Sequence, residues 1–334
     1  MVIIMKTTDN ILKNKINSYL EKEYKYLDYL LVGRSAIDLA IKEIKNNSNL
    51  RKAYLPTYIC DVMVQPFIDN NIQIDFYDVF YNKKEFTIDT NKFKNDDNYI
   101  ILYCDYFINN EKLYNEVADS ISKNAILIHD VTHTLFSKDY IDTRDDFLVS
   151  SIRKWFVTPE GGLLISKKPI SIALDSGNSN YLNLKEAAQV AKKEYYQDPS
   201  LEKKIIYRNY SNQAENELCN NYALKKMSEK TKNTIIDIDF NKFFDDKKQK
   251  FIILKELLKE YEILCGANEN NSVFTIPIIN LENRKKTLEE FRNNLIRCDT
   301  MWEYGNSKIM STFVNKSICI DISDNTIKRL TKGR

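Results

Sequence analysis

Glycine and histidine are the residue types that this chain of 334 residues uses most sparingly. It holds seven glycines, where average usage would give about twenty-three. Each one is therefore expected where a turn or a close backbone approach requires it, and two of them are adjacent, at Gly161 and Gly162. The only two histidines, His129 and His133, lie on either side of Asp130. Any chemistry that uses an imidazole is confined to that segment.

A charge excess, paired cysteines and long apolar runs are also lacking. The 49 lysines and arginines nearly balance the 47 acids, for a net charge of +2, which gives no electrostatic reason to expect nucleic acid as a partner. The six cysteines lie far apart without CxxC spacing, as free thiols do. No run reaches the roughly 18 apolar residues of a membrane span, and the apolar start MVIIM is too short for a signal peptide. We expect a soluble, cytoplasmic protein without a membrane partner.

The composition is that of an ordinary globular chain, with 43% apolar and 29% charged residues. A disordered or collagen-like chain is therefore excluded. At about 100–200 residues per domain, the length predicts two domains. A change of pattern near residue 235 places their boundary, so we expect a large domain over residues 1–235 and a small domain over residues 236–334.

Short apolar runs alternate with helical patterns between about residues 30 and 170. The expected strands are Ala53–Leu55, Ile74–Tyr77, Tyr99–Cys104, Ala125–His129, Phe147–Ser150 and Leu163–Ser166. The expected helices, from apolar residues at helical spacing, are Ser35–Ile44, Asp61–Asn70 and Leu113–Ser122. This alternation predicts an α/β fold with a mainly parallel sheet. Ligands of such sheets bind beyond the carboxyl ends of the strands.

The rest of the chain follows a different pattern. From about residue 183 to 262 it is helical and heavily charged, which is typical of solvated helix faces. Strand patterns return over residues 272–279 and 317–322, with a helical pattern over 288–296 between them. We therefore expect the small C-terminal domain to be α+β.

Gly33, Arg34 and Ser35 open a helical pattern directly after the apolar run YLLV. A glycine at a helix start presents backbone N–H groups and the positive end of the helix dipole, which suits an anion. The simpler interpretation is that Ser35 caps the helix and Gly33 makes the turn. Taken alone, the segment favours this simpler interpretation.

Asp130 follows a strand-like run, where a carboxylate is costly to bury unless it meets a cation or strong donors. One interpretation pairs Asp130 with a protonated heterocyclic nitrogen while His133 contacts another polar group of the same ligand. In a second, His129, Asp130 and His133 bind a metal. A third is an ordinary surface turn, and the segment alone leaves all three open.

Lys154 follows the strand-like run FLV, behind Ser150, Ser151 and Arg153. Lysine forms imines with carbonyl compounds when burial or a nearby cation lowers its pKa, and Arg153 would act in that direction. The alternative is a solvated surface lysine. The next segment, Thr158–Gly162, ends in the glycine pair, which permits a close backbone approach or a tight turn.

An anion site, a carboxylate, an amine and a tight glycine turn are together what one cofactor needs. Pyridoxal 5'-phosphate (PLP) requires a lysine imine, an acid beside its pyridinium nitrogen, and donors to its phosphate. The combination is more specific than any of its members, and it favours a PLP enzyme.

These segments resemble the DegT/StrS-type sugar aminotransferases, which are fold type I PLP enzymes. GRSAIDLAI is similar to that family's phosphate-side helix start, and ILIHDVTHTLFS to its E-D-A-A-Q-A segment, with Asp130 on the pyridinium aspartate and His133 on the glutamine. SSIRKWFVTPEGGLLIS resembles the segment of the imine lysine. The lysine stands six residues before the glutamate in both, which places Lys154 on the imine lysine and Glu160 on the E-G-G glutamate.

The resemblance implies a large domain with a mainly parallel seven-stranded sheet in three layers, a small α+β domain, and a homodimer. It implies that Lys154 and Asp130 are catalytic. The cofactor contacts it implies are Lys154, Asp130, His133, Gly33, Arg34, Ser35, Ser150 and Tyr58. Four positions depart from the family. Val149 stands where a phosphate-binding serine is usual, so that Ser150 or Ser151 would replace it, and Cys60 stands where an aromatic ring stacks on the cofactor, with Tyr58 nearby. Arg34 replaces a small hydroxyl residue, and Ile108 replaces a glycine.

The function that the resemblance implies is amino transfer, with glutamate as the usual donor and a keto-sugar, nucleotide-linked, as the acceptor. Such a product would enter a surface polysaccharide or a glycoconjugate. The alternatives are sugar dehydration or another PLP reaction on the same scaffold, a metal-dependent enzyme built on His129, Asp130 and His133, and a descendant that only binds.

Overall fold

The computed structural model describes residues 7–82, 85–107, 110–136, 144–264, 273–300, 302 and 310–332. The chain forms two compact units. Unit 1 consists of residues 1–43 and 149–238, and unit 2 consists of residues 44–148 and 239–334. The domain boundary expected between residues 235 and 236 stays a prediction.

A seven-stranded sheet forms in the order β1-β9-β8-β7-β6-β2-β3. Its strands are β1 (Tyr26–Leu30), β2 (Lys52–Pro56), β3 (Gln73–Tyr77), β6 (Ile100–Cys104), β7 (Ile126–Asp130), β8 (Phe147–Ser150) and β9 (Gly162–Ser166). Strand β2 is parallel to β3 and β6, and β6 is parallel to β7, whereas β1 is antiparallel to β9. All residues of β6 and β9 are buried, as in sheets that are covered on both faces. The predicted α/β class with a mainly parallel sheet is confirmed.

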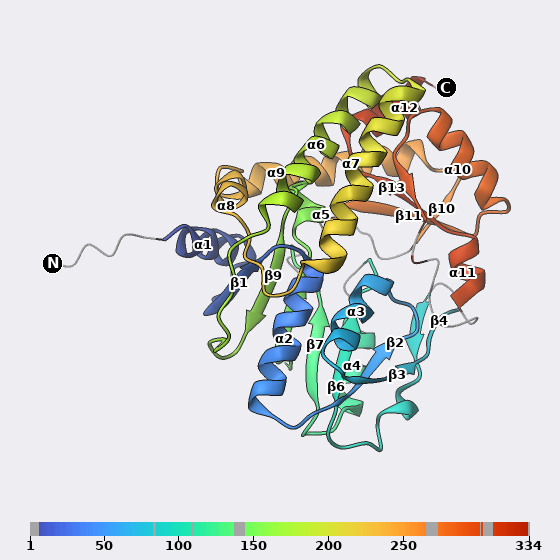
Figure 1. The fold of residues 1–334 in the computed structure, drawn as a ribbon. Coiled ribbons are helices and arrows are strands. Elements are labelled where there is room, and N and C mark those ends of the chain that lie inside the picture. The colour runs from blue at the N-terminus through green and yellow to red at the C-terminus, as the bar shows by residue number, and fades with distance from the viewer. Residues whose placement is uncertain are drawn as a thin grey trace. The chain divides into compact units, whose positions relative to one another are not determined.

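Helices make up most of the rest of unit 1. They are α1 (Thr8–Leu20), α2 (Gly33–Asn47, which runs on into unit 2), α5 (Arg153–Phe156), α6 (Ser179–Gln197), α7 (Leu201–Asn220) and α8 (Glu229–Ile236). The long helices α6 and α7 lie side by side (Figure 1). Side-chain caps from Asn178 and Ser200 begin them. Their buried residues Tyr181, Ala214 and Leu218 pack in one apolar cluster with residues just after β1.

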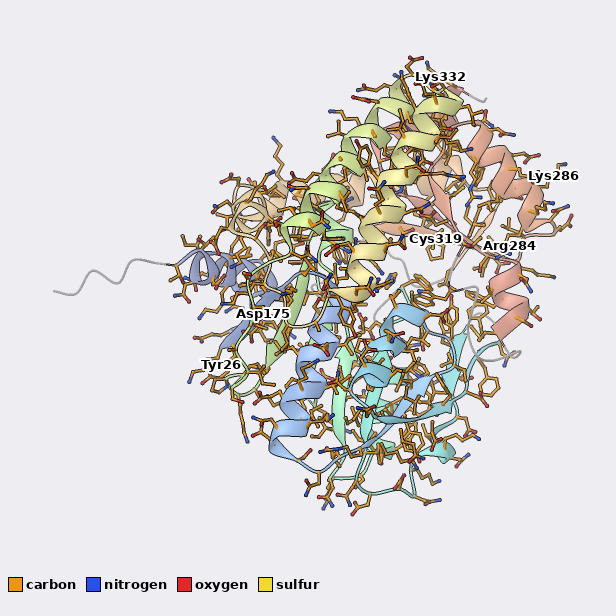
Figure 2. The ribbon with its side chains drawn as sticks, viewed as in Figure 1. Tyr26, Asp175, Arg284, Lys286, Cys319 and Lys332 are labelled. Carbon is orange, nitrogen blue, oxygen red and sulfur yellow. The ribbon has the colours of Figure 1, made fainter. Side chains whose placement is uncertain are left out.

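The C-terminal part of unit 2 forms a second, antiparallel sheet in the order β10-β11-β13-β12. Its strands are β10 (Glu262–Ile263), β11 (Thr275–Ile279), β12 (Cys298–Asp299) and β13 (Ile318–Asp321), and its helices are α9 (Phe240–Leu257), α10 (Arg284–Asn293), α11 (Ser311–Asn315) and α12 (Asp324–Lys332). Arg284, labelled in Figure 2, begins α10 and donates to the Val314 carbonyl (3.1 Å). The small C-terminal α+β part is therefore confirmed.

The N-terminal part of unit 2 adds helices and a hairpin to the strands of the large sheet. These are α3 (Asp61–Asp69), α4 (Glu111–Ser120), the short 3₁₀ helix η1 (Thr90–Lys92), and the antiparallel hairpin β4 (Val79–Asn82) and β5 (Glu85–Ile88). Among the helices that the structure describes, none has the length and apolar character needed to cross a bilayer.

Candidate functional site

Lys154 lies in a single helical turn directly after strand β8, in unit 1. The turn, α5, is four residues long. The Lys154 N–H donates to the Ser151 carbonyl (3.0 Å). Trp155 and Phe156 are buried, whereas Lys154 is exposed. The neighbours of the lysine therefore anchor its backbone while its side chain stays accessible.

The glycine pair Gly161–Gly162 packs against two backbone segments of unit 1. A Cβ on Gly161, whose φ is +147°, would lie 2.6 Å from the Arg153 nitrogen, and a Cβ on Gly162 would lie 2.2 Å from the Val32 oxygen. The Gly161 carbonyl accepts from the Arg153 N–H (3.3 Å), and the Gly161 N–H donates to the Leu31 carbonyl (2.8 Å). A side chain fits at neither position, so the expected close backbone approach is confirmed.

Ser150 is the last residue of β8 and carries a buried hydroxyl. The residue is 2% exposed, and its Oγ has no hydrogen-bond partner within the described residues. Gly33 lets α2 begin close to the next residue along the chain, Ser151, because a Cβ on Gly33 would lie 3.0 Å from the Ser151 Cβ. The unpaired, buried hydroxyl of Ser150 is a group whose hydrogen bonding a bound ligand would complete.

The side chains of Arg34 and Ser35 have partners inside unit 1. The Arg34 guanidinium pairs with Glu215 (Nη2 to Oε2, 3.4 Å) and lies 5.7 Å from the centre of the Tyr222 ring. The Ser35 hydroxyl donates to the Tyr222 carbonyl (2.7 Å). Both side chains therefore tie α2 to the end of α7, and their contact with a phosphate stays a prediction.

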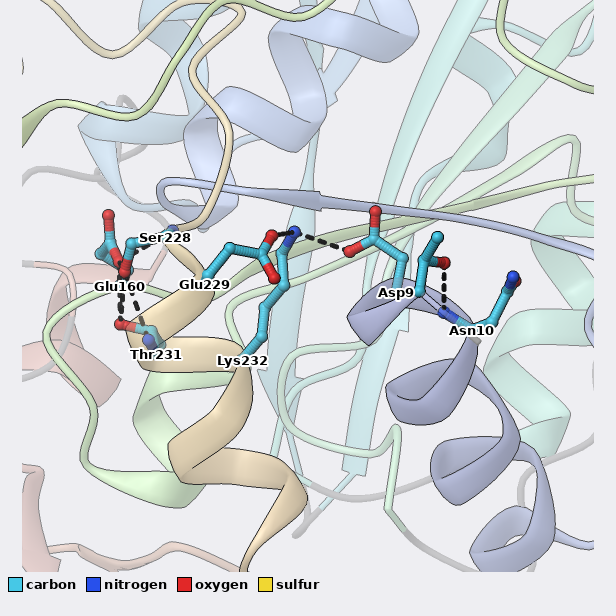
Figure 3. A network of polar contacts seen from close by, with 8 residues as sticks. Asp9, Asn10, Glu160, Ser228, Glu229, Thr231 and Lys232 are labelled. Atoms are coloured by element: carbon cyan, nitrogen blue, oxygen red, sulfur yellow. Dashed lines mark hydrogen bonds and ion pairs between the residues drawn. The ribbon is translucent and has the colours of Figure 1, made fainter. Parts of the chain in front are cut away.

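Glu160 precedes the glycine pair and contacts the N-terminus of α8 (Figure 3). Its Oε2 accepts from the backbone N–H of Ser228 (3.1 Å) and from the hydroxyl of Thr231 (2.8 Å). On the same helix, Lys232 pairs with Asp9 of α1 (2.6 Å). The sequence pattern singled out Glu160 only as part of the E-G-G motif, and no signal in the sequence marks its partners.

Asp130 ends strand β7 in unit 2 and is half-buried. Its Oδ1 accepts from the Thr132 N–H (2.8 Å), which makes the turn that an aspartate typically forms with the residue two positions on. Its carbonyl accepts from the Asp105 N–H (3.1 Å) at the end of β6. The carboxylate is therefore held in a defined orientation at the carboxyl end of its strand.

His133 and Tyr58 both lie in an aromatic cluster of unit 2. The His133 ring centre lies 4.8 Å from that of Phe107 and 6.1 Å from that of Trp302, and the Tyr58 ring lies 4.6 Å from Trp302. Tyr58 is fully buried, which raises its pKa well above the usual value. Its hydroxyl has no hydrogen-bond partner within the described residues.

His129 is buried between two carboxylates of unit 2. Its Nε2 lies 3.1 Å from Asp105 Oδ1, and its Nδ1 lies 3.1 Å from Asp145 Oδ1. Burial alone would lower the pKa of His129, but the two carboxylates raise it to about 10. Both ring nitrogens of His129 already face these carboxylates, and no group of three or more metal-binding side chains occurs in the described part of the chain. The structure therefore gives no support to the metal interpretation.

The predicted site residues fall into two sets. Unit 1 brings Gly33 against Ser151, which stands between Ser150 and the Lys154 turn, and Arg34 and Ser35 follow Gly33 in the chain. Unit 2 holds Asp130 with His133 on the turn that follows it, and Tyr58 contacts the same Trp302 ring as His133. The role of each residue toward a cofactor stays a prediction.

Comparisons with known proteins reveal similarity in structure only. No family model and no curated protein sequence matches the chain. The sugar aminotransferase CalS13 from Micromonospora echinospora matches with a TM-score of 0.64 at 8% identity, over 98% of this chain and 91% of that one. GDP-4-keto-6-deoxy-D-mannose-3-dehydratase from E. coli, with bound hydrated PLP, matches with a TM-score of 0.63 at 13% identity, over 98% and 92%. The synthase of 3-amino-5-hydroxybenzoic acid matches with a TM-score of 0.61 at 11% identity, over 97% and 88%.

The similarity to these proteins is a similarity of fold. At these identities it shows that the chain has the architecture of the fold type I PLP enzymes. In all, 901 chains of known structure match, and one fold supports many reactions. The function must therefore be argued from the site residues.

Proposed function

We propose that this chain is a PLP-dependent aminotransferase that moves an amino group, from glutamate, to a nucleotide-linked keto-sugar. The observation that supports the proposal most is the unpaired, buried hydroxyl of Ser150, four positions before an exposed lysine and next in the chain to Ser151, which lies against Gly33 at the start of α2. The unpaired hydroxyl of Tyr58 in unit 2 also suits a polar ligand. The residues present therefore fit the cofactor.

Unit 1 supplies the phosphate side and the amine. The Ser150 hydroxyl and the start of α2 at Gly33 would donate to the phosphate, with Arg34 and Ser35 nearby. Lys154 would hold the cofactor covalently, and its amine would serve as the base and then the acid that moves a proton.

Unit 2 supplies the ring contacts. Asp130, oriented by the Thr132 N–H, would keep the ring nitrogen protonated, which stabilises the negative charge that develops in the transition state. His133 would contact the phenolic oxygen of the ring, and Tyr58 would contact the cofactor from the aromatic cluster. PLP itself supplies an electron sink for the substrate carbanion when it is bound.

Labelling of Lys154 tests the proposal. The full-length chain is incubated with PLP, reduced with borohydride and digested, and the modified peptide is identified by mass spectrometry. We expect the label on the peptide that contains Lys154, and its loss in Lys154→Ala. Lys167→Ala, which removes an exposed lysine just after β9, is the matched control and should keep the label. A label on another peptide, or none, would refute the proposal.

Sugar dehydration is a second candidate, because the E. coli dehydratase matches as well as the aminotransferase CalS13 does, with TM-scores of 0.63 and 0.64. Incubation with glutamate and nucleotide-linked keto-sugars separates the two reactions. An amino-sugar with formation of 2-oxoglutarate supports amino transfer, and a deoxy-keto-sugar supports dehydration. We also propose a homodimer, for which light scattering should give about twice the chain mass of 39.3 kDa.

A further inference from the structure

The Glu160 carboxylate is completely buried, at 0% exposure, although the proposed chemistry makes no use of it. Burial of a carboxylate is costly unless strong donors replace water. Three donors converge on its Oε2: the Ser228 N–H (3.1 Å), the Ser228 hydroxyl (2.5 Å) and the Thr231 hydroxyl (2.8 Å). Since Ser228 is the N-cap of the eight-residue helix α8, the carboxylate also lies at the positive end of a helix dipole.

Within the described part of the chain, hydrogen bonds reach one of the two oxygens of this carboxylate. The other, Oε1, is buried and has no hydrogen-bond partner within the described residues. Within the described residues, the hydrogen bonds of the Glu160 carboxylate go to Ser228 and Thr231 at the start of α8. Helix α1 anchors α8 in turn through the pair between Lys232 and Asp9 (Figure 3). The glutamate thus connects its own loop to a fixed helix.

The loop that Glu160 anchors touches the lysine turn. The Thr158 hydroxyl donates to the Glu160 carbonyl (2.7 Å), which closes the loop on itself. The next residue, Gly161, packs on the Arg153 backbone and accepts its N–H (3.3 Å). A helix of one turn such as α5 does not hold its own conformation, so the orientation of Lys154 depends on contacts of this kind.

We propose that Glu160 is a positioning residue for Lys154. By binding the N-terminus of α8, its carboxylate fixes the Gly161 turn against the Arg153 amide, and this sets the direction of the lysine amine. The inference rests on the proposed function, in which Lys154 is the residue that holds the cofactor.

The test compares the full-length wild type with Glu160→Ala, Glu160→Gln and the control Glu229→Gln. Glu229 lies in the first turn of the same helix, but its largely exposed side chain pairs with Lys232 and not with the loop. Two quantities are measured: hydrogen exchange of the peptide 151–157 in the cofactor-free chain, and the rate at which PLP becomes attached to Lys154, followed by borohydride trapping between pH 7 and 10.

In Glu160→Ala, we expect exchange of peptide 151–157 to rise about tenfold relative to the rest of the chain, as loss of a helix-capping contact implies. We expect attachment of PLP to slow about tenfold, with a changed pH profile, because the amine is no longer held in place. Glu160→Gln retains an acceptor oxygen for Ser228 and Thr231 and should recover most of both quantities. Glu229→Gln should match the wild type.

Uniformly faster exchange in Glu160→Ala, or an unchanged attachment rate, would overturn the positioning role and leave Glu160 a stabilising residue only. If Glu160→Ala does not fold, Thr231→Val removes one of the three donors and should shift both quantities in the same direction, about threefold. A wild type that takes no label on Lys154 would refute the proposed function instead. The exchange data would still show whether Glu160 orders the turn.

Discussion

The buried ion cluster of His129 with Asp105 and Asp145 makes a quantitative prediction for alkaline pH. The three residues are each at most 3% exposed, and the carboxylates raise the pKa of His129 from 6.5 to about 10. At 1.36 kcal/mol per pKa unit, a displacement of this size corresponds to about 5 kcal/mol of folding stability. Breaking a buried ion pair by removal of one partner costs a similar amount, about 3–5 kcal/mol.

Because the pKa of His129 is higher in the folded chain than in the unfolded chain, protonation of His129 stabilises the fold. The stabilisation is fully present below pH 6.5, where the ring is protonated in both the folded and the unfolded chain. It is lost as the pH rises through about 10, where the folded chain releases the proton. The free energy of unfolding of the wild type should therefore fall by several kcal/mol between pH 7 and 10, in excess of the fall in a variant that lacks the imidazole.

Urea unfolding of wild type and His129→Gln, followed by circular dichroism at pH 7, 8, 9 and 10, measures this difference. We expect the variant to be about 3–5 kcal/mol less stable at pH 7. This difference in the free energy of unfolding between wild type and variant should narrow to about 1 kcal/mol toward pH 10. That value is the contribution of the hydrogen bond that a neutral ring still donates. His133→Gln, which alters the half-buried histidine of the aromatic cluster, should show no such pH dependence. A gap that is constant with pH would refute the ionised pairing.

Three further substitutions, the last with a control at Val157, test separate parts of the structure. Asp130→Asn should still take the PLP label on Lys154 but lose at least about a hundredfold in turnover, and unchanged turnover would contradict its role. Gly161→Ala should lower the free energy of unfolding by about 3 kcal/mol in urea titrations, because its Cβ would meet the Arg153 nitrogen at a φ of +147°; wild-type stability would show that the turn is not constrained. Trp155→Ala should cost about 3–5 kcal/mol because the side chain is fully buried, whereas Val157→Ala, at 59% exposure, should change stability by less than about 0.5 kcal/mol.

The large sheet was predictable because its strands are short apolar runs between helical patterns. The prediction for Tyr99–Cys104 agrees with β6 to within one residue, and Phe147–Ser150 agrees with β8. The hairpin of β4 and β5 was not predicted. In the sequence, two lysines stand between the segments of these strands, and not the Asn-Gly or Asp-Gly pair that is typical of a tight hairpin, so the sequence gives no hairpin signal.

Local spacing also located the lysine turn and the glycine pair, because the residue types that mark them stand close together within residues 150–162. It could not show that Ser35 donates to a carbonyl 187 positions away. For the same reason the serine was interpreted as a cap or an anion contact, the two roles that neighbouring residues suggest. When the partner of a side chain is distant in the sequence, neither periodicity nor spacing identifies that partner.

His129 and Glu160 show that the partners of buried charged groups are equally hard to identify from the sequence. Each stands beside a residue that the sequence marks for chemistry, Asp130 in one case and Gly161 in the other, and each is buried. A buried charge persists only where donors or opposite charges replace water. For Glu160 these come from α8, 68 and 71 positions later. For His129 they come from the end of β6 and from the segment before β8. The type of residue therefore indicates that a partner must exist, and only the fold identifies it.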